Sequence, residues 1–481
     1  MKQQWIAGVW AVWVVLGVGV GWLPAGDFRA GAATSNITPN IGHDIIGGFV
    51  PFPSTHIHDE LHARCLVLDD GQTRLALVVC DLLGMDRIVS DEARQQIKDR
   101  YQIAPAQVLI CATHTHSASS ALGEDSRLLD QQPDAYQHLV ASKIADGVGR
   151  AIQHLQPAEM AFGKVSAPDH VFNRRWHMRA GTVPINPFGE NDAVKMNPPR
   201  GHANLVKPAG PTDPDVSFLA IRHRDGRPLS VFASYSLHYV GGVGRGHVSA
   251  DYFAVFSEHL KHLLGQSGPV EFDQAPFVAM LANGTSGDIN NINFRTPRPR
   301  KQPYEQMQAV GRDVAQRVHG AMKDLTYRDD VTLAAAYREP EIAWRRPTPQ
   351  QRKWAETTLA AGRQQERDLS YIYAQRAMRL AAYPERTTVP LQVFRIGNTC
   401  LGTMPFEIFC EIGLEFKERC PLQPAFLVSL AHGYLGYLPT PRQHRLGGYE
   451  TWLGTNRVEP LASDKLLQVL LEMSQELQQK E

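Results

Sequence analysis

The sequence predicts an α/β fold in which mixed β-sheets are flanked by helices within a single large domain. Short apolar strands alternate with amphipathic stretches along the chain, a pattern typical of this class. No Ser/Gly-rich linker divides the chain after its first residues. We therefore expect one domain over residues 34–481. The clearest helical stripe consists of Met307, Val310, Val314, Val318 and Met322.

The composition is that of an ordinary globular protein. Of the 481 residues 43% are hydrophobic, and 49 basic side chains balance 49 acidic ones to a net charge of zero. Binding to a nucleic-acid backbone depends on concentrated positive charge, which this chain lacks. We therefore exclude nucleic acid as a partner and expect a stable buried core.

Residues 1–33 are typical of a signal peptide or an N-terminal membrane anchor. Lys2 precedes an uncharged stretch from Trp5 to Gly26, and the small residues at 31–33 follow it. The apolar stretch is longer than a secretory h-region and approaches the length that spans a bilayer, so cleavage and retention both remain open. We expect an exported protein that is secreted, periplasmic or anchored.

The cysteines are expected to be free and buried, because nearly all of them lie inside apolar runs. Cys65 and Cys80 flank a predicted hairpin with an Asp70-Gly71 turn, which would place Cys65 opposite Ala76. These two thiols would then not face each other. The six cysteines are Cys65, Cys80, Cys111, Cys400, Cys410 and Cys420.

The other predicted elements are helices and one long loop. The segment 181–215 is rich in Pro, Gly and Asn and shows no periodicity. A loop of this length inside a compact domain usually has a function, so we expect a lid over a site. Helical patterns cover residues 90–101, 134–155, 351–380, 407–419 and 464–479.

Polar side chains follow several predicted strands, where ligands bind in α/β sheets. The strand 108–112 leads directly to His114 and His116, which extended backbone would place on one face. His238 follows a second strand, and Asn290 lies in an Asx-rich stretch after a third. Two imidazoles on one face are a metal-site geometry, although a surface pair or a core histidine is the simpler interpretation of each residue alone.

A carboxylate and two tyrosines occupy similar positions. Glu407 follows the predicted hairpin 391–403 in what would be the first turn of a helix, where its charge would also suit the helix dipole. Tyr437 and Tyr449 lie in Gly-rich loops after the strand 426–430. Histidines, a carboxylate and tyrosines at five strand ends together favour a zinc site with an open coordination position.

Five short motifs carry these residues. They are Thr113-His114-Thr115-His116-Ser117, Ser286-Gly287-Asp288, Pro405-Phe406-Glu407, Gly436-Tyr437 and Tyr449-Glu450. The sequence that contains them resembles the N-terminal catalytic domain of the neutral/alkaline (non-lysosomal) ceramidases, from about residue 34 to residue 460. The beginning of the domain, Asn36-Ile37-Thr38-Pro39, is similar as well.

The resemblance implies a site and its roles. His116 and Arg174 would contact the scissile amide and its neighbouring hydroxyls, and Tyr449 would face the substrate, twelve residues after a tyrosine on the metal. For Arg174 a buried salt bridge is the alternative role. One zinc ion per chain (Zn2+) would be held by His114, His238, Glu407 and Tyr437.

The sequence departs from the family at two places. Asn290 stands where the ceramidases have a serine; an amide cannot act as a nucleophile, but it can still donate a hydrogen bond to an oxyanion. Attack by a metal-activated water therefore remains open to this chain. The chain also ends soon after Tyr449, which would leave no room for the small C-terminal β domain of the family.

We therefore expect a zinc-dependent amidohydrolase that acts on linear amides. Its substrate would be an N-acyl lipid such as ceramide (N-acylsphingosine), cleaved to a fatty acid and an amine, with contact to a membrane surface. One alternative is a hydrolase of a different N-acyl or ester substrate. Another is an exported binding protein of the same fold that has lost catalysis. A serine hydrolase that uses Ser286 or Ser117 lacks the Gly-x-Ser-x-Gly elbow.

Overall fold

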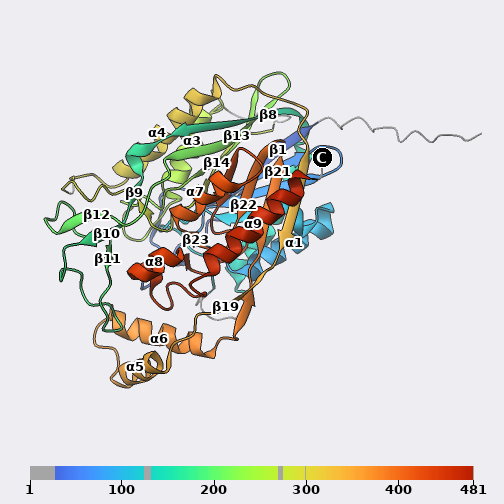
Figure 1. Cartoon of the computed structure of the whole chain (residues 1–481). Helices are drawn as coiled ribbons and strands as arrows, with labels where there is room; N and C mark the ends of the chain where they lie inside the picture. The colour runs from blue at the N-terminus through green and yellow to red at the C-terminus, as the bar shows by residue number, and fades with distance from the viewer. Residues whose placement is uncertain (1–27, 124–131, 269–274, 298, 480–481) are drawn as a thin grey trace, which may run out of the picture.

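Two β-sheets packed face to face form the centre of the molecule (Figure 1). The structure is a computed structural model and describes residues 28–123, 132–268, 275–297 and 299–479. The larger sheet has eight strands in the order β16-β14-β13-β8-β1-β5-β6-β7, and the smaller has four in the order β18-β21-β22-β24. Apolar side chains from both sheets, such as Phe232 and Phe394, share one buried cluster between the layers. The predicted α/β class with mixed sheets is confirmed.

The large sheet combines antiparallel pairs with two parallel pairs, β6 with β7 and β14 with β16. Strands such as β6 and β7 consist almost entirely of apolar residues, because both of their faces are covered. Its strands are β1 (Arg29–Asn36), β5 (His62–Asp69), β6 (Arg74–Cys80), β7 (Val108–Ala112), β8 (Gln156–Ser166), β13 (Asp215–His223), β14 (Pro228–Tyr235) and β16 (Val278–Asn283). The small sheet consists of β18 (Leu333–Arg338), β21 (Leu391–Ile396), β22 (Thr399–Thr403) and β24 (Ala425–Val428).

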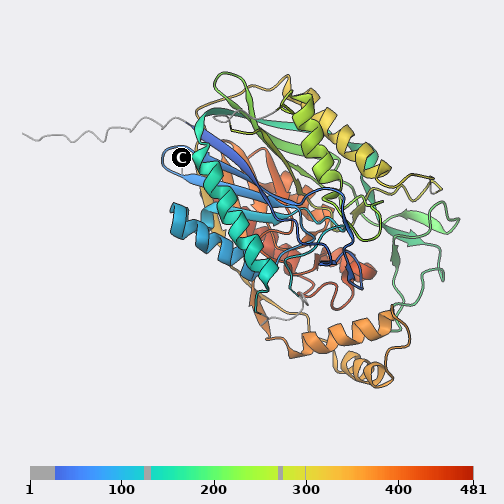
Figure 2. The ribbon, with the colours of Figure 1, turned by 180° about the vertical axis from the view of Figure 1, so that it is seen from behind.

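Helices cover the two outer faces of this sandwich (Figures 1 and 2). On the large sheet, α1 and α2 pack over one part and α3 and α4 over another, each pair with its own apolar cluster. On the small sheet, α7 and α9 cover the outer face. The helices are α1 (Arg87–Tyr101), α2 (Ala135–Gln153), α3 (Asp251–Leu263), α4 (Glu305–Met322), α5 (Pro349–Ala360), α6 (Leu369–Ala382), α7 (Cys410–Arg419), α8 (Pro441–Leu446) and α9 (Ala462–Gln478).

The domain begins earlier than predicted. Residues 31–33 were assigned to the leader, but they lie in β1, which pairs with β5 along its whole length and with β8 at its start. A Cβ atom on Gly31 would lie 2.1 Å from the carbonyl oxygen of Ala151 in α2. The small residues therefore allow a helix to pack closely on the strand, and the boundary at residue 33 is wrong. The leader itself, residues 1–27, lies outside the described residues.

Several predicted elements differ in detail. The hairpin after β5 has a four-residue loop, so Cys65 pairs with Val78 instead of Ala76, and all six cysteines are buried and free, as predicted. The single helix predicted over 351–380 is two helices, because Gly362 adopts a positive φ between them. The helix α3 was not predicted. Among the described residues, no helix is both long and apolar enough to cross a bilayer.

The predicted long loop 181–215 contains two short strands. These are β11 (Val194–Met196) and β12 (Leu205–Pro208), which pair on either side of β10 (Arg175–Met178) in a small separate sheet at one side of the molecule. The remaining short strands that bear on the site are β9 (Phe172–Asn173), β17 (Ile289–Asn290), β23 (Glu407–Ile408) and β25 (Tyr437–Leu438). Six further short strands are β2 (Asp44–Ile45), β3 (Phe52–Pro53), β4 (His56–Ile57), β15 (His247–Val248) and the pair β19 (Glu341–Ala343) with β20 (Arg386–Thr388).

The contact between β1 and α2 can be tested at Gly31. We expect Gly31→Ala to lower the free energy of unfolding by about 1–3 kcal/mol, because its methyl group would press on the helix backbone. Gly48→Ala is the matched control, since a Cβ there meets no atom within 4 Å. Thermal denaturation measures both. An unchanged melting temperature for Gly31→Ala would contradict the tight packing of β1 on α2.

Candidate active site

The polar residues singled out from the sequence come together where strands of both sheets end. His114 follows β7 and His238 follows β14 of the large sheet, whereas Glu407 follows β22 of the small one. β23 and β25 form a parallel pair in which Glu407 lies opposite Tyr437. The prediction that Glu407 lies in the first turn of a helix is therefore wrong. Glu407 lies in a short strand, and the helix α7 begins at Cys410.

Three histidines and one carboxylate converge on a common point. The Nε2 atoms of His114 and His116 are 3.1 Å apart. The Oε2 atom of Glu407 lies 3.3 Å from Nε2 of His114 and 3.7 Å from Nε2 of His238. One ligand atom from each of the three histidines lies within 4.8 Å of the others. His114, His238 and Glu407 are buried, and His116 is half-buried.

Backbone carbonyls set the orientation of all three rings. The Nδ1 atoms of His114 and His116 lie 2.7 Å from the carbonyl oxygens of Leu83 and Gly47. Nδ1 of His238 lies 3.2 Å from the oxygen of Ser286. Each Nδ1 therefore carries the proton, which leaves Nε2 with its lone pair toward the centre. His114 has a φ of 69°, so the predicted extended backbone is wrong there even though the two rings meet.

The donor set fits a divalent cation. Nε2 of His238 and Oε2 of Glu407 are buried and have no hydrogen-bond partner in the described structure, although such atoms are nearly always paired. Burial lowers the pKa of His116 and of His238 well below the usual value, which keeps both imidazoles neutral, as metal ligands must be. Imidazole nitrogens with a carboxylate oxygen are ligands that suit zinc.

A chain of hydrogen bonds surrounds Glu407. Its Oε1 accepts a 2.7 Å bond from the hydroxyl of Tyr434, a residue that the sequence analysis did not single out. Tyr437 also hydrogen-bonds to Glu407, and Arg174 donates to the Tyr437 oxygen at 3.0 Å. Burial alone would raise the pKa of Glu407, but the neighbouring His114 and Arg174 outweigh it and hold the pKa below its usual range.

Arg174 forms the buried salt bridge that was the alternative role weighed for it, and its contact with a substrate stays a prediction. Its Nε atom donates to Oε1 of Glu450 at 2.8 Å, and the other carboxylate oxygen accepts a 2.6 Å bond from Arg175. All three side chains are buried. The salt bridge leaves Nη2 of Arg174 directed at Tyr437, so Arg174 is held by Glu450 and at the same time reaches the centre.

Tyr449 lies between this centre and a larger pocket. Its ring centroid is 5.8 Å from that of Tyr437 and 6.0 Å from that of Phe49. The pocket encloses about 390 Å³, and the predicted lid segment 181–215 supplies much of its wall. Its lining is mainly apolar and includes Val183, Ile185, Val194, Met196, Leu369 and Trp452.

Asn290 lies in β17, opposite Phe172 of β9, and its side chain is turned toward the predicted lid. β17 pairs with β9, and the side-chain Nδ2 of Asn290 donates to Oδ1 of Asn197 at 3.1 Å. The backbone N–H of Asn197 in turn donates to the carbonyl of Arg174 at 2.8 Å. Within the described residues, the side chain of Asn290 makes no hydrogen bond to the three histidines.

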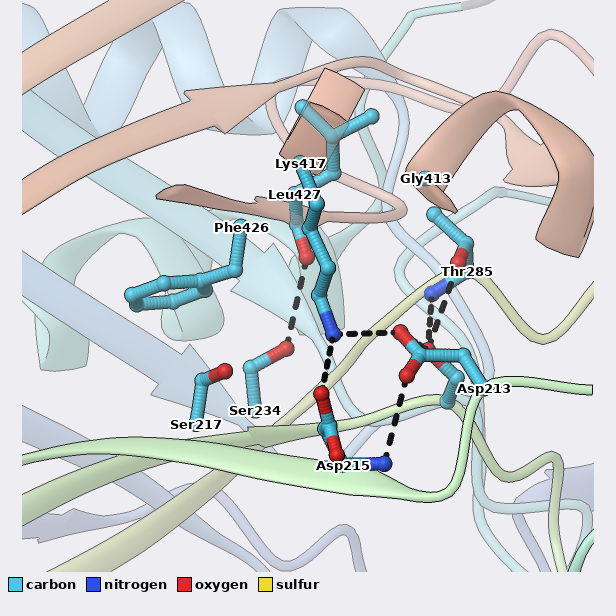
Figure 3. Close-up of a pocket in the computed structure, with 10 residues that line it drawn as sticks. Asp213, Asp215, Ser217, Ser234, Thr285, Gly413, Lys417, Phe426 and Leu427 are labelled. Atoms are coloured by element: carbon cyan, nitrogen blue, oxygen red, sulfur yellow. Dashed lines mark hydrogen bonds and ion pairs between the residues drawn. The ribbon is translucent and has the colours of Figure 1, made fainter. Parts of the chain in front are cut away.

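A second polar network supports the loop that carries Ser286. Nζ of Lys417 lies 2.7 Å from Oδ2 of Asp213, and a dashed line in Figure 3 marks this ion pair. Asp213 also approaches the hydroxyl of Ser236. That hydroxyl accepts a 3.1 Å bond from the backbone N–H of Thr285. Since Ser286 orients His238, this buried network holds the histidine in place from behind.

Comparisons with known proteins point to one family. The family model for the N-terminal part of neutral/alkaline non-lysosomal ceramidase matches residues 28–331. A neutral ceramidase of Mycobacterium tuberculosis is 24% identical over 242 residues, which are 49% of this chain and 35% of that protein. The match thus spans about a third of the length of this curated relative.

Two solved structures have the same fold. The neutral ceramidase from Pseudomonas aeruginosa matches with a TM-score of 0.66 at 17% identity, over 94% of this chain and 75% of that one. A ceramidase complexed with C2 matches with a TM-score of 0.68 at 16% identity, over 94% and 76% of the two chains. The family match covers more than half of the sequence and begins with β1. The chain belongs to the neutral/alkaline non-lysosomal ceramidase family.

Proposed function

We propose that this protein is a zinc-dependent hydrolase that cleaves the amide bond of an N-acyl lipid such as ceramide. The observation that carries the proposal is the set of buried atoms left without partners, Nε2 of His238 and Oε2 of Glu407, beside a large apolar pocket. The family relationship supports hydrolysis of such an amide to a fatty acid and an amine. Export by the N-terminal segment is part of the same proposal and is supported by its sequence.

His114, His238, Glu407 and Tyr437 are the residues proposed to hold one zinc ion. A zinc ion bound there supplies Lewis-acid activation of the scissile carbonyl and of water. His116 adds a third imidazole within reach of the same point. The half-buried position of His116 and its stacking on Tyr239, with centroids 3.7 Å apart, are consistent with a role toward the substrate as well.

The surrounding residues orient the amide and stabilise its developing charge. The phenol of Tyr449 is placed to donate a hydrogen bond to a carbonyl oxygen that becomes an oxyanion. The neutral imidazole of His116, which has its lone pair on Nε2, is instead suited to accept a proton from the attacking water. Arg174 holds the hydroxyl of Tyr437 at 3.0 Å. The pocket beside Tyr449 has the volume and apolar lining of a small-molecule site and is proposed to take a hydrocarbon chain.

Asn290 favours direct attack by water over a covalent acyl-enzyme. An amide nitrogen is not a nucleophile, and the side chain of Asn290 is already bonded to Asn197. The same residue is the one observation that favours the alternative of a binding protein that has lost catalysis. The exposed side chain of Ile185 at the rim of the pocket, 66% accessible, supports contact between the rim and a lipid surface.

The first expected outcome concerns metal content. Purified protein should contain about one zinc per chain by mass spectrometry, and the His114→Ala, His238→Ala double variant should lose it, because two of the proposed ligands are removed. His138→Ala, which changes an exposed histidine of α2, is the control and should keep its zinc. A well-folded wild type without zinc would rule out the zinc mechanism.

His116→Ala separates the two roles of that histidine. If His116 acts as a proton acceptor and not as a ligand, the variant should keep its zinc while kcat falls by about 10²–10⁴-fold, the effect of removing a general base. Loss of zinc from this single variant would instead make His116 a ligand.

The second expected outcome concerns catalysis. Release of fatty acid from a panel of N-acyl amides and esters should be measurable for the wild type and should fall to background in His114→Ala. Tyr449→Phe should lower kcat by about 10²-fold with unchanged zinc content, because it removes one hydrogen-bond donor to the oxyanion. Equal turnover by the wild type and His114→Ala would remove the zinc mechanism, whereas turnover at background in both would leave the binding protein as the better description.

A further inference from the structure

Two arginines face the aromatic ring that borders Tyr449. The guanidinium carbon of Arg367 lies 5.0 Å from the ring centroid of Phe49, and that of Arg376 lies 5.3 Å from the same centroid. Phe49 in turn packs edge-on against Tyr449, with centroids 6.0 Å apart, and lines the large pocket. Two positive charges are thus placed around a single ring at the edge of the proposed active site.

Neither charge is neutralised by the protein. Arg376 lies in α6 and is only 8% exposed. Its Nη1 atom donates a hydrogen bond of 3.4 Å to the hydroxyl of Thr455, which is a neutral group. In the part of the chain that the structure describes, no carboxylate lies within ion-pair distance of Arg367 or Arg376. Arg174 and Arg175, which are buried like Arg376, contrast with it because they share the carboxylate of Glu450, whereas Arg367 is exposed.

The acidic groups nearest to the pocket are already engaged. Asp192 lines the pocket, but one of its oxygens accepts a 2.8 Å bond from the indole of Trp452 and the other accepts one from Asn186. Glu450 is bonded to two other arginines. A buried guanidinium without a counter-charge is costly, so a site of this kind is suited to an anion that arrives with the ligand.

We propose that Arg367 and Arg376 bind an anionic group of the substrate, so that this enzyme acts on N-acyl amphiphiles that carry a carboxylate or a phosphate in preference to neutral N-acylsphingosine. The inference rests on the proposed amidase function and narrows its substrate class. Guanidinium groups bind carboxylate and phosphate oxygens in bidentate pairs. The apolar wall formed by Val194, Met196 and Leu369 remains available for the hydrocarbon chain.

Matched substrates test this preference. N-dodecanoylglycine and N-dodecanoylethanolamine differ only in a carboxylate against a hydroxymethyl group, and N-dodecanoylsphingosine 1-phosphate and N-dodecanoylsphingosine differ only in the phosphate. We expect kcat/KM of the wild-type holoenzyme to be at least about 10-fold higher for the anionic member of one of the pairs. The pair that shows the difference identifies which oxyacid is recognised.

The variants assign the preference to the two arginines. Arg376→Met and Arg367→Met should each lower the anionic-to-neutral ratio of kcat/KM by about 10-fold or more and leave turnover of the neutral member within about 2-fold. Arg376→Lys should recover part of the ratio, because it restores the charge without the planar fork. Arg363→Met is the control: Arg363 is exposed on the same connecting segment, and the ratio should not change.

The outcomes separate this inference from the proposed function. Equal kcat/KM for both members of each pair, or an equal loss on both in Arg376→Met, would overturn the role of the arginines and leave the amidase standing. If no amide is cleaved, calorimetric titration with N-dodecanoylglycine decides: binding that is lost in Arg376→Met supports the anion site without the amidase. Binding that is unchanged in Arg376→Met, or absent from the wild type, overturns the anion site.

Discussion

The carboxylate of Glu407 is the group on which the site depends, because a buried charge has to be compensated by its neighbours. His114 and His238 approach one of its oxygens at 3.3 and 3.7 Å, and Tyr434 donates to the other. These partners come from the ends of strands in both sheets. The carboxylate can therefore be accommodated only when the two-sheet sandwich is complete, so assembly of the fold and assembly of the site are one event.

The motif Ser286-Gly287-Asp288 shows how the two sheets are joined at this point. The carbonyl of Ser286 orients His238, and a Cβ on Gly287 would lie 2.5 Å from the carbonyl oxygen of Glu407. Asp288 accepts hydrogen bonds from the backbone of Cys410, at the start of α7, and from the side chain of Asn173. The motif therefore connects the strand ends of the large sheet to the start of α7.

How much of the fold and of the site can be predicted from the sequence depends on how far apart in the chain the interacting residues are. The strands, most helices and the positions of His114, His238 and Glu407 at strand ends follow from local patterns. The hydrogen bond of Tyr434 to Glu407 joins residues 27 positions apart, and the salt bridge between Arg174 and Glu450 joins residues 276 positions apart. No local pattern identifies either pair. The leader boundary failed for a different reason: small residues satisfy both a cleavage site and a strand packed against a helix.

The centre and the pocket are constrained in different ways. Around Glu407 each group compensates another, so a change in one would leave a buried charge or hydroxyl without a partner. The pocket wall is built from loop segments and from α6, and no carboxylate among the described residues forms an ion pair with Arg367 or Arg376. Asn290 also bonds to a loop residue, Asn197, and not to the centre. The fold can thus keep one chemistry at its centre while the loops adapt the pocket to a different N-acyl substrate.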